Sequence, residues 1–471
     1  MLRTRSTKII ATVGYASQDM GILKKLVLAG VDVFRLNFSH GDHTTHTQVV
    51  EKIRIVEKEL AFPLGIIVDL QGPKLRIGKF ASSSVRLEEG DAFTLDLSSE
   101  LGTKERVTFP HASLYPYIKP GSILLLDDGN IRLHVNAIHE DRLLTQVISG
   151  GTLSDNKGVN LPHLSFPISP LTDKDRADLK CIEKLDIDFI ALSFVQKAED
   201  IRELRALIPP KFRILAKIEK PMALNHLDAI LQEADGLMVA RGDLGIEMDV
   251  EHVPSTQKRL IELSKKYGKT VIVATQMLES MISSPTPTRA EVSDVANAVY
   301  ETADCVMLSA ESAVGQHPIK VVEMMNRIIE TTEKDGHYQK IVASTRPLPY
   351  ATIADAITLA AKQVADTLNA PIIATFTASG GTAIRASRQR PLHPILSLTR
   401  DITTARLLTL YWGVYPYIIH EEGNLRLMIN VIAALCEKEG YAKKGDPIVI
   451  TGGDPMGEAG KTNFVHVKVI D

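Results

Sequence analysis

Residues 214–219 read Ile-Leu-Ala-Lys-Ile-Glu, a nearly continuous apolar run that ends in a base and an acid two residues apart. Such a run is typical of a buried strand in a parallel sheet. Side chains alternate along a strand, so Lys217 and Glu219 should point to the same side. Because buried unpaired charge is costly, two interpretations are open: the two residues form an ion pair that closes the strand, or the acid holds a metal while the base faces an anion.

Similar strands, separated by helical patterns, lie on both sides of this run. Three are expected upstream, at residues 8–14, 31–39 and 65–70. Five more are expected at 188–194, 213–219, 236–243, 270–277 and 305–311. Eight strand-helix units predict a (β/α)8 TIM barrel, whose site lies at the carboxyl ends of the strands.

Two other regions interrupt or follow this pattern. Residues 71–164 show no convincing helix but several short alternating runs with turn signals, such as Asp-Asp-Gly-Asn at 127–130. They predict an inserted β-barrel domain, which leaves residues 1–70 and 165–342 for the TIM barrel. A polar segment at 331–350 is interpreted as a linker. Beyond it, helices alternate with strands and predict a C-terminal doubly wound α/β domain at 343–471.

Composition excludes several classes of protein. With 44% hydrophobic and 24% charged residues, the chain has an ordinary globular composition, and its net charge of −3 offers no basic field for nucleic acid. No apolar run approaches the ~20 residues needed to span a bilayer. Cys181, Cys305 and Cys436 are too far apart for a metal or redox motif. We therefore expect a cytoplasmic protein with no nucleic-acid or membrane partner.

Polar side chains end most of the predicted barrel strands. In chain order they are Arg35, Asn37, Ser39, Asp69, Ser193, Lys217, Glu219, Arg241, Gly242, Asp243, Thr275, Ser309 and Glu311. The carboxyl ends of barrel strands meet at one mouth, so this convergence indicates an active site.

The residue types at this mouth narrow the chemistry. Glu219 and Asp243 are carboxylates without a nearby His or Cys cluster, which suits a hard cation, Mg²⁺ or Mn²⁺. Arg35 and Lys217 are cations of the kind that stabilise phosphoryl oxygens. Together they predict metal-assisted phosphoryl transfer to or from a small anion.

Two other features bear on how ligands bind. Gly242 would let a ligand approach the backbone closely, and Thr275 supplies a hydroxyl. The run Gly-Lys-Thr at 460–462 is similar to the end of a P-loop, but Pro455 stands where that motif needs its first glycine. We interpret this run as an ordinary loop.

Six runs make the sequence resemble a known family along essentially its whole length. They are FRLNFSHG at 34–41, AKIEKP at 216–221, ARGDLG at 240–245, ATQMLESM at 274–281, PTRAEVSDVANAV at 287–299 and MLSAES at 307–312. Through them the sequence resembles the pyruvate kinase family. The resemblance implies the same three-part architecture and a homotetramer. It also implies phosphoryl transfer from phosphoenolpyruvate to ADP, giving pyruvate and ATP in the last step of glycolysis.

The resemblance also implies roles for individual residues. The implied catalytic residues are Lys217, Arg35 and Thr275, and the implied substrate contacts are Arg35, Ser193, Lys217, Gly242, Asp243 and Thr275. The implied nucleotide contacts are Asn37, His40, Arg76 and Lys157, and the implied Mg²⁺ ligands are Glu219 and Asp243. Since Lys157 lies in the inserted domain, that domain is expected to close as a lid.

One run departs from the family pattern. The family's K⁺-dependent members bind the ion at the positions of Asn37, Ser39, Asp69 and Leu70, and carry a Thr-Lys-Gly-Pro-Glu run after the aspartate. Here residues 70–74 read Leu-Gln-Gly-Pro-Lys. Lys74 can supply the positive charge itself, so the sequence predicts activity without K⁺. The alternative is that Lys74 is a tolerated surface change.

A second candidate site lies in the C-terminal domain. Its residues form a small, hydroxyl-rich turn into a helix: Thr377, Ser379, Gly380, Gly381 and Thr382. Helix N-terminal amides suit a phosphate, and this run is similar to the family's sugar-phosphate effector loop, faced by a glycine-rich stretch at 451–457. Few basic residues are nearby, so a sugar or nucleotide monophosphate is expected rather than a bisphosphate. An ordinary structural turn is the alternative.

Two rival functions use the same fold. One is an aldolase in which Lys217 forms a Schiff base, and the other is a barrel that only binds a metabolite. The paired carboxylates Glu219 and Asp243 argue against the aldolase. A mere binding protein would be expected to lose the charged strand ends, which are all present.

Overall fold

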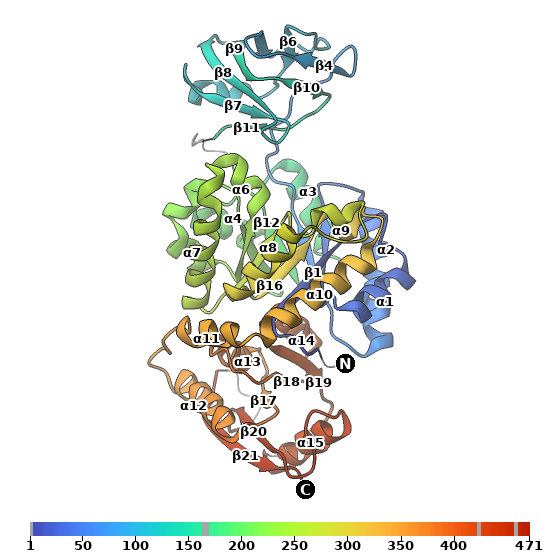
Figure 1. Ribbon diagram of the computed structural model, residues 1–471, viewed down its shortest axis with the longest axis vertical. Coiled ribbons are helices and arrows are strands. Elements are labelled where there is room, and N and C mark those ends of the chain that lie inside the picture. Colours follow the sequence, from blue (N-terminus) through green and yellow to red (C-terminus); the bar gives the residue numbers. More distant parts are fainter. Residues whose placement is uncertain (1–2, 163–168, 422–424, 456–459) are drawn as a thin grey trace.

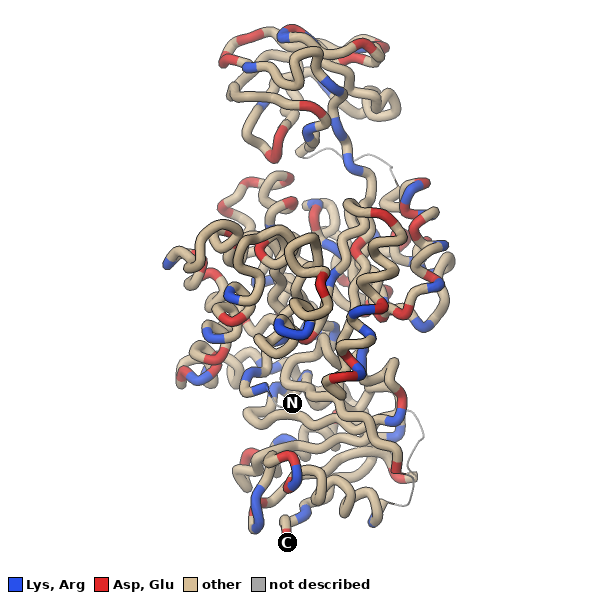
Figure 2. Tube along the Cα trace, turned by 90° about the vertical axis from the view of Figure 1, so that its right-hand side faces the viewer, with Lys and Arg blue, Asp and Glu red and all other residues tan. Residues whose placement is uncertain are grey.

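The computed structural model describes residues 3–162, 169–421, 425–455 and 460–471. It has three parts along its long axis, with an inserted β domain at one end, a barrel in the middle and an α/β domain at the other end (Figure 1). A narrow neck joins the inserted domain to the barrel (Figure 2).

Eight parallel strands close the barrel in the order β1-β16-β15-β14-β13-β12-β3-β2. Their bounds are β1 Lys8–Val13, β2 Val33–Asn37, β3 Gly65–Asp69, β12 Phe189–Leu192, β13 Arg213–Ile218, β14 Gly236–Ala240, β15 Thr270–Ala274 and β16 Cys305–Leu308. The predicted TIM barrel is therefore confirmed.

Helices surround the barrel and cover the outward-facing side chains of its strands. They are α1 Met20–Ala29, α2 His43–Leu60, α3 Asp173–Ile182, α4 Ala198–Leu207, α5 Leu227–Glu233, α6 Arg241–Glu247, α7 Val253–Lys266, α8 Arg289–Tyr300, α9 Ala310–Ala313, α10 Pro318–Lys334 and α11 Gly336–Ser344. Along β13, Ile214, Ala216 and Ile218 pack beneath these helices, while Leu215 faces the barrel interior.

The linker predicted at residues 331–350 is largely wrong. The end of α10 and all of α11 occupy most of it. The segment is polar overall, but α11 buries Tyr338 and Val342 against the barrel core. Two apolar side chains four residues apart are enough to hold a short helix in place, and that signal is hidden by the polar residues around it.

The inserted domain is all β apart from one 3₁₀ helix at Ala112–Tyr117. Its strands are β4 Ser84–Leu87, β5 Ala92–Asp96, β6 Arg106–Thr108, β7 Ile123–Leu126, β8 Ile131–Ile138, β9 Arg142–Ser149, β10 Gly151–Ser154 and β11 Val159–Asn160. They form a mixed sheet, β11-β7-β8-β9-β5-β6, and the pair β10-β4. The predicted turn at 127–130 joins β7 to β8, with positive φ at Asp127 and Asp128. The predicted boundary at 164/165 lies outside the described residues.

The C-terminal sheet has the order β19-β18-β17-β20-β21, parallel except for the edge strand β21. The strands are β17 Ile373–Phe376, β18 Ile395–Thr399, β19 Val414–Ile418, β20 Pro447–Gly452 and β21 Phe464–Val469, and the helices are α12 Ile353–Leu368, α13 Gly381–Arg388, α14 Ile402–Leu408 and α15 Leu425–Lys438. Ala361 and Ala365 of α12 pack on one face, and Ile432 of α15 packs on the other. This is the doubly wound domain that the sequence predicts.

The barrel and the C-terminal domain share a core. The apolar cluster inside the barrel, which includes Leu215 and Met238, continues into Leu408, Tyr411 and Val414 of the C-terminal domain. These residues close the amino-terminal end of the barrel, because they pack against its inward-facing side chains.

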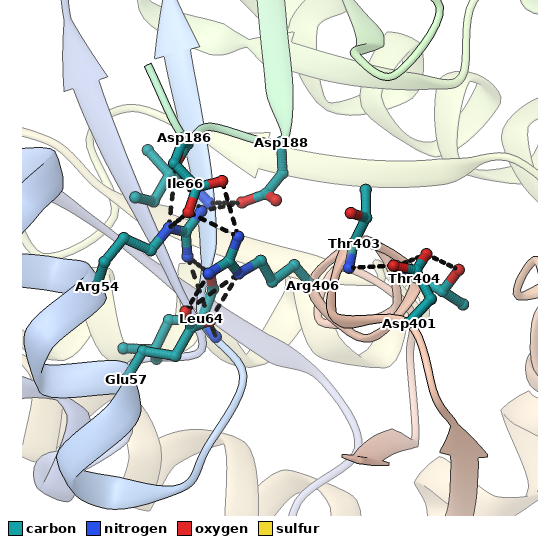
Figure 3. A network of polar contacts seen from close by, with 10 residues as sticks. All are labelled: Arg54, Glu57, Leu64, Ile66, Asp186, Asp188, Asp401, Thr403, Thr404 and Arg406. Carbon is teal, nitrogen blue, oxygen red and sulfur yellow. Dashed lines mark hydrogen bonds and ion pairs between the residues drawn. The ribbon is translucent and has the colours of Figure 1, made fainter. Parts of the chain in front are cut away.

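A buried ionic network also joins the two domains (Figure 3). Arg406 of α14 donates to Glu57 of α2 at 2.9 Å and to Asp186 at 2.9 Å. Arg54 shares this network through Asp188, whose second hydrogen bond comes from the backbone of β3. Because Glu57 and Asp188 are buried, these contacts compensate charges that could not be left unpaired.

No helix of the described residues is long and apolar enough to cross a membrane.

Candidate active site

Three charged side chains face the barrel interior just below its mouth. Arg35, Asp69 and Lys217 each lie two residues beyond an inward-facing apolar residue of the same strand. Alternation along β2, β3 and β13 therefore brings them together. All three are buried, with Asp69 only 1% exposed.

Lys217 is the centre of this layer. Its Nζ lies 2.8 Å from Glu219 Oε1 and 3.0 Å from Asp69 Oδ1, and it donates a 2.7 Å hydrogen bond to Ser193 Oγ. Arg35 Nη2 lies 2.6 Å from the other oxygen of Asp69. Lys217 and Glu219 thus do form an ion pair, but within a larger layer of two cations and two carboxylates.

Electrostatics keep Lys217 protonated. Burial alone would lower its pKa, but the charges of Asp69 and Glu219 outweigh burial and raise it above its usual value. Burial would likewise raise the pKa of Asp69, yet Lys217 and Arg35 hold it below its usual range. A Schiff-base lysine needs a lowered pKa to act as a nucleophile, so this environment disfavours the aldolase alternative.

Glu219 and Asp243 fit a divalent cation. Burial raises the pKa of Glu219, Lys217 opposes that rise, and the charge of Asp243 adds to it, so the two carboxylates repel each other. A cation between them would relieve this repulsion. In the described part of the chain no three His, Cys, Asp or Glu side chains are grouped as a metal cage. Two carboxylates completed by substrate oxygens and water are the pattern that Mg²⁺ favours.

The end of β14 differs from the prediction. The strand stops at Ala240, and Arg241, Gly242 and Asp243 form the first turn of α6. The N–H of Gly242 donates a 2.7 Å hydrogen bond to Thr275 Oγ1. A helix start leaves N–H groups without intrahelical partners, so this turn offers donors to an anion.

Thr275 has a strained backbone. Its φ of 69° lies in the left-handed region, which a β-branched residue rarely adopts. Arg241 holds it there, because its Nη2 donates to the Thr275 carbonyl at 2.6 Å while its Nη1 lies 2.7 Å from Asp294. Strain maintained by neighbouring groups is characteristic of functional sites. No local sequence pattern indicates this role of Arg241.

A cavity of about 290 Å³ lies between the inserted domain and the barrel mouth. Lys74, Arg76 and Lys157 line its upper side, and Asp243 lines the barrel side. Lys157 Nζ lies 2.6 Å from Asp127, and Arg76 donates to the Asn156 carbonyl. The predicted nucleotide contacts Arg76 and Lys157 thus face the same cavity as the predicted metal ligand.

One contact ties the inserted domain to the barrel across this cavity. Asn160 of β11 donates a 2.9 Å hydrogen bond to Glu247 Oε1 of α6. The same oxygen lies 2.6 Å from Lys220 Nζ. Glu247 is therefore held between the two domains.

His40 lies among cations. Burial lowers its pKa, and the charges of Lys74, Arg76 and Arg35 lower it further.

Two of the predicted monovalent-cation positions are already engaged in internal bonds. Asn37 Oδ1 accepts from the N–H of Ser39, and the carbonyl of Leu70 accepts from Ser193.

Strand β16 contributes less than expected. Glu311 is buried, but its carboxylate accepts from the N–H of Ser309 at 2.6 Å and from that of Leu278 at 3.4 Å. Ser309 and Glu311 therefore stabilise the local backbone. Their position near a strand end does not reveal this structural role.

The predicted effector loop lines a second cavity, of about 370 Å³, in the C-terminal domain. Thr377, Ser379, Gly381 and Thr382 line it, and Gly380 takes the positive φ of 87° that precedes α13. Part of the facing stretch 451–457 lies outside the described residues.

The expectation that few basic residues lie near this loop is wrong. Arg400 and Lys461 both line it. The run 460–462, interpreted above as an ordinary loop, contributes Lys461 and also Thr462, which bonds Thr382 through their hydroxyls at 2.8 Å. The position of this loop could have been predicted from the strand order, because loops at the same edge of a sheet lie close together.

The fold and the mouth of the barrel define a class of protein. The mouth of this TIM barrel holds two buried cations, a pair of carboxylates suited to a divalent metal and a helix start with N–H donors. These are the features of an enzyme that acts on a small anionic substrate.

Comparison with known proteins identifies the family. Models of "Pyruvate kinase, barrel domain" and "Pyruvate kinase, alpha/beta domain" match residues 4–322 and 355–468. A pyruvate kinase of Methylorubrum extorquens is 45% identical over 100% of this chain and 98% of its own length, and one of Agrobacterium vitis is 47% identical over 98% of each. The crystal structure of a pyruvate kinase from Cryptosporidium parvum has a TM-score of 0.93 and 33% identity, covering 99% of this chain and 97% of that one. The chain belongs to the pyruvate kinase family, and it is a kinase.

Proposed function

We propose that this enzyme transfers the phosphoryl group of phosphoenolpyruvate to ADP, giving pyruvate and ATP. The observation that carries the proposal is the buried layer in which Lys217 contacts Asp69, Glu219 and Ser193. A coupled assay of pyruvate formation tests it: the rate should depend on phosphoenolpyruvate, ADP and Mg²⁺ together. Pyruvate formation that does not require ADP would contradict it.

Several residues of the mouth have roles in this proposal. Arg35 and Lys217 hold the phosphoryl group and stabilise the charge that develops on it during transfer. The N–H groups at Gly242 and Asp243, together with Thr275, bind the substrate carboxylate. The Gly242 N–H then exchanges its present hydrogen bond to Thr275 Oγ1 for one to the substrate. Thr275 then lies beside the enolate oxygen, and Ser193 orients Lys217.

Glu219 and Asp243 hold Mg²⁺ or Mn²⁺ in this proposal. When bound, the metal neutralises charge on the phosphoryl and carboxylate oxygens of the substrate. Glu219 is fixed for this task because its Oε2 accepts a 2.9 Å hydrogen bond from the Phe194 N–H.

ADP binds in the cavity between the domains, with contacts from Arg76 and Lys157 in its lining and from Asn37 and His40, which lie outside that lining. The Asn160 to Glu247 hydrogen bond positions the inserted domain as a lid over it. Asn160→Ala should therefore raise KM for ADP by about 10-fold or more, the worth of a hydrogen bond to a charged group, and leave KM for phosphoenolpyruvate unchanged. Equal changes in both constants would argue against the lid assignment.

Lys74 supplies the charge that K⁺ provides in other members of the family. Burial lowers the pKa of Lys74, and the charge of Lys217 lowers it further. The charges of Asp243 and Glu219 raise it. Lys74 thus belongs to the charge system of the mouth. Asn37 Oδ1 and the Leu70 carbonyl each accept an internal hydrogen bond, so K⁺ would share these oxygens with the donors of Ser39 and Ser193.

Activity in 100 mM Na⁺ or tetramethylammonium should equal that in K⁺ within about 2-fold, because the ammonium group of Lys74 already supplies the charge that K⁺ would provide. The matched variant Lys74→Glu restores the residue of K⁺-dependent relatives and should become at least about 10-fold more active in K⁺ than in Na⁺. A wild-type rate that collapses in Na⁺ would show that Lys74 does not replace the ion.

A sugar or nucleotide monophosphate activates the enzyme from the C-terminal cavity. The phosphate lies at the start of α13, against Ser379, Gly381 and Thr382, where helix amides and hydroxyls are available. Lys461 and Arg400 add the positive charge. The family resemblance also suggests a homotetramer, which sedimentation analysis would test.

Among a panel of sugar and nucleotide phosphates, at least one monophosphate should lower the phosphoenolpyruvate concentration for half-maximal rate. Lys461→Met should raise the activator concentration needed by about 10-fold, since a charged contact to phosphate is lost. The unactivated rate should not change. Lys468→Met, on the outer strand β21, is the control and should respond as wild type. Failure of every monophosphate would contradict the effector site.

A further inference from the structure

The loop at residues 70–74 leads from β3 into the inserted domain and brings Lys74 to the cavity at the barrel mouth. Within the described part of the chain, the ammonium group of Lys74 has no hydrogen bond or ion pair. The place of this charge in the cavity lining therefore depends on how the backbone of the loop is held.

A buried carboxylate holds this backbone. Asp175 lies in the first turn of α3 and is 0% exposed. Its Oδ1 accepts from the N–H of Gln71 at 2.9 Å and from that of Gly72 at 3.3 Å. Its Oδ2 accepts from the N–H and the hydroxyl of Thr172, at 2.9 Å and 2.6 Å, and so caps α3. Capping uses only Oδ2, so Oδ1 is left for the loop.

The loop fits closely against the barrel at Gly72. Its φ of 66° lies in the left-handed region, and a Cβ on it would lie 2.5 Å from an atom of the Phe194 ring. The N–H of Lys74 donates to the Gly72 carbonyl at 2.9 Å, and Pro73 between them has its φ fixed by its ring. A displacement of Gly72 would therefore carry Lys74 with it.

We propose that Asp175 is a positioning residue, whose hydrogen bonds to Gln71 and Gly72 hold the loop so that the charge of Lys74 stays at the barrel mouth. Hydrogen bonds to a carboxylate are roughly twice as strong as those between neutral groups, so two of them suit this task. Asp175 does not itself line the cavity. The inference rests on the proposed function, and it adds to it a residue that acts only through the loop.

Three variants separate the loop from the helix cap. Asp175→Ala removes the acceptor of both loop amides and should lower kcat by about 10–10²-fold, the cost of displacing a positioned group by about 1 Å. In Asp175→Asn the carbonyl oxygen can accept from the loop while the NH₂ group donates to Thr172 Oγ1. Its kcat should stay within about 3-fold of wild type, although the weakened cap lowers Tm.

Thr172→Ala is the matched control. It removes the hydroxyl that caps α3 and leaves the bonds from Gln71 and Gly72 intact. Its Tm should fall, and its kcat should stay within about 2-fold of wild type. Equal losses of kcat in Asp175→Ala and Thr172→Ala, or no rescue by Asp175→Asn, would overturn the proposal.

The Lys74→Met background shows whether Asp175 acts through Lys74. In that background Asp175→Ala should lower kcat by no more than about 2-fold, because the group that it positions is already gone. If the effect of Asp175→Ala is as large as in the wild-type chain, Asp175 does not act through Lys74.

Hydrogen exchange of the wild-type chain, followed by mass spectrometry, tests the loop bonds without any activity and without a variant that could fail to fold. The amides of Gln71 and Gly72 should exchange at least about 10²-fold more slowly than unprotected amides. Exchange at the unprotected rate would overturn the proposal. A chain that makes no pyruvate while these amides stay protected would contradict the proposed function instead.

Discussion

Lys217→Met should lower kcat by about 10³-fold or more, with a much smaller change in the affinity for phosphoenolpyruvate. The ammonium group contacts both carboxylates and Ser193, so it is held where charge develops on the transferred phosphoryl group. Losing one such preorganised group costs about 10²–10³ in kcat, and losing a full charge at a phosphoryl group costs about 10³–10⁵. Steady-state kinetics and calorimetric titration with phosphoenolpyruvate would separate the two effects.

Lys8→Met is the matched control. Lys8 is also a buried lysine of the barrel, but it lies at the opposite end, where its Nζ donates to the carbonyl of Val414 at 2.6 Å. Its loss should lower Tm and leave kcat within about 2-fold of wild type, because it is remote from the mouth. If both variants lose activity equally, Lys217 has a structural role only.

Glu219→Gln should raise the Mg²⁺ concentration for half-maximal rate by about 10–100-fold, and lower kcat at saturating metal. The amide keeps the shape of the side chain and its acceptor for the Phe194 N–H, but it removes one of the two carboxylates whose charges repel each other. Perturbing the surroundings of a metal ligand alone costs about 10–100-fold in affinity, so removing a ligand charge should cost at least as much. Mg²⁺ titrations of the rate, and of Mn²⁺ binding followed by electron paramagnetic resonance, would measure the shift.

Glu311→Gln provides the control for this experiment. Glu311 is a glutamate of similar burial near the end of a barrel strand, and it too accepts backbone N–H groups. Its substitution should leave the Mg²⁺ midpoint unchanged. An equal shift in both variants, or none in Glu219→Gln, would mean that the metal binds elsewhere.

The sequence predicted the barrel because its signals are local and repeated. Each strand is a short apolar run, and Arg35, Asp69 and Lys217 follow the inward-facing positions of β2, β3 and β13 by simple alternation. The convergence of these residues followed from the strand count alone. The ion contacts of Asp69 with Arg35 and Lys217 were not predicted, because Asp69 was assigned to a monovalent-cation site.

The features that were missed depend on backbone geometry or on distant segments. The strained φ of Thr275 and its support by Arg241 arise from contacts between β14 and β15 that no local pattern records. Lys461 lines the C-terminal cavity because its loop folds back beside Thr382, 79 residues earlier in the chain. Long-range placement of this kind is invisible to reasoning from spacing.

The shared core beneath the barrel has a consequence for how the chain can be divided. Leu408, Tyr411 and Val414 plug the barrel floor, and Arg406 neutralises Glu57. A barrel expressed without the C-terminal domain would expose this apolar floor to solvent, so it should aggregate rather than fold. The domain that carries the proposed effector cavity thus also closes the floor of the barrel, so deleting the domain would disturb the barrel as well.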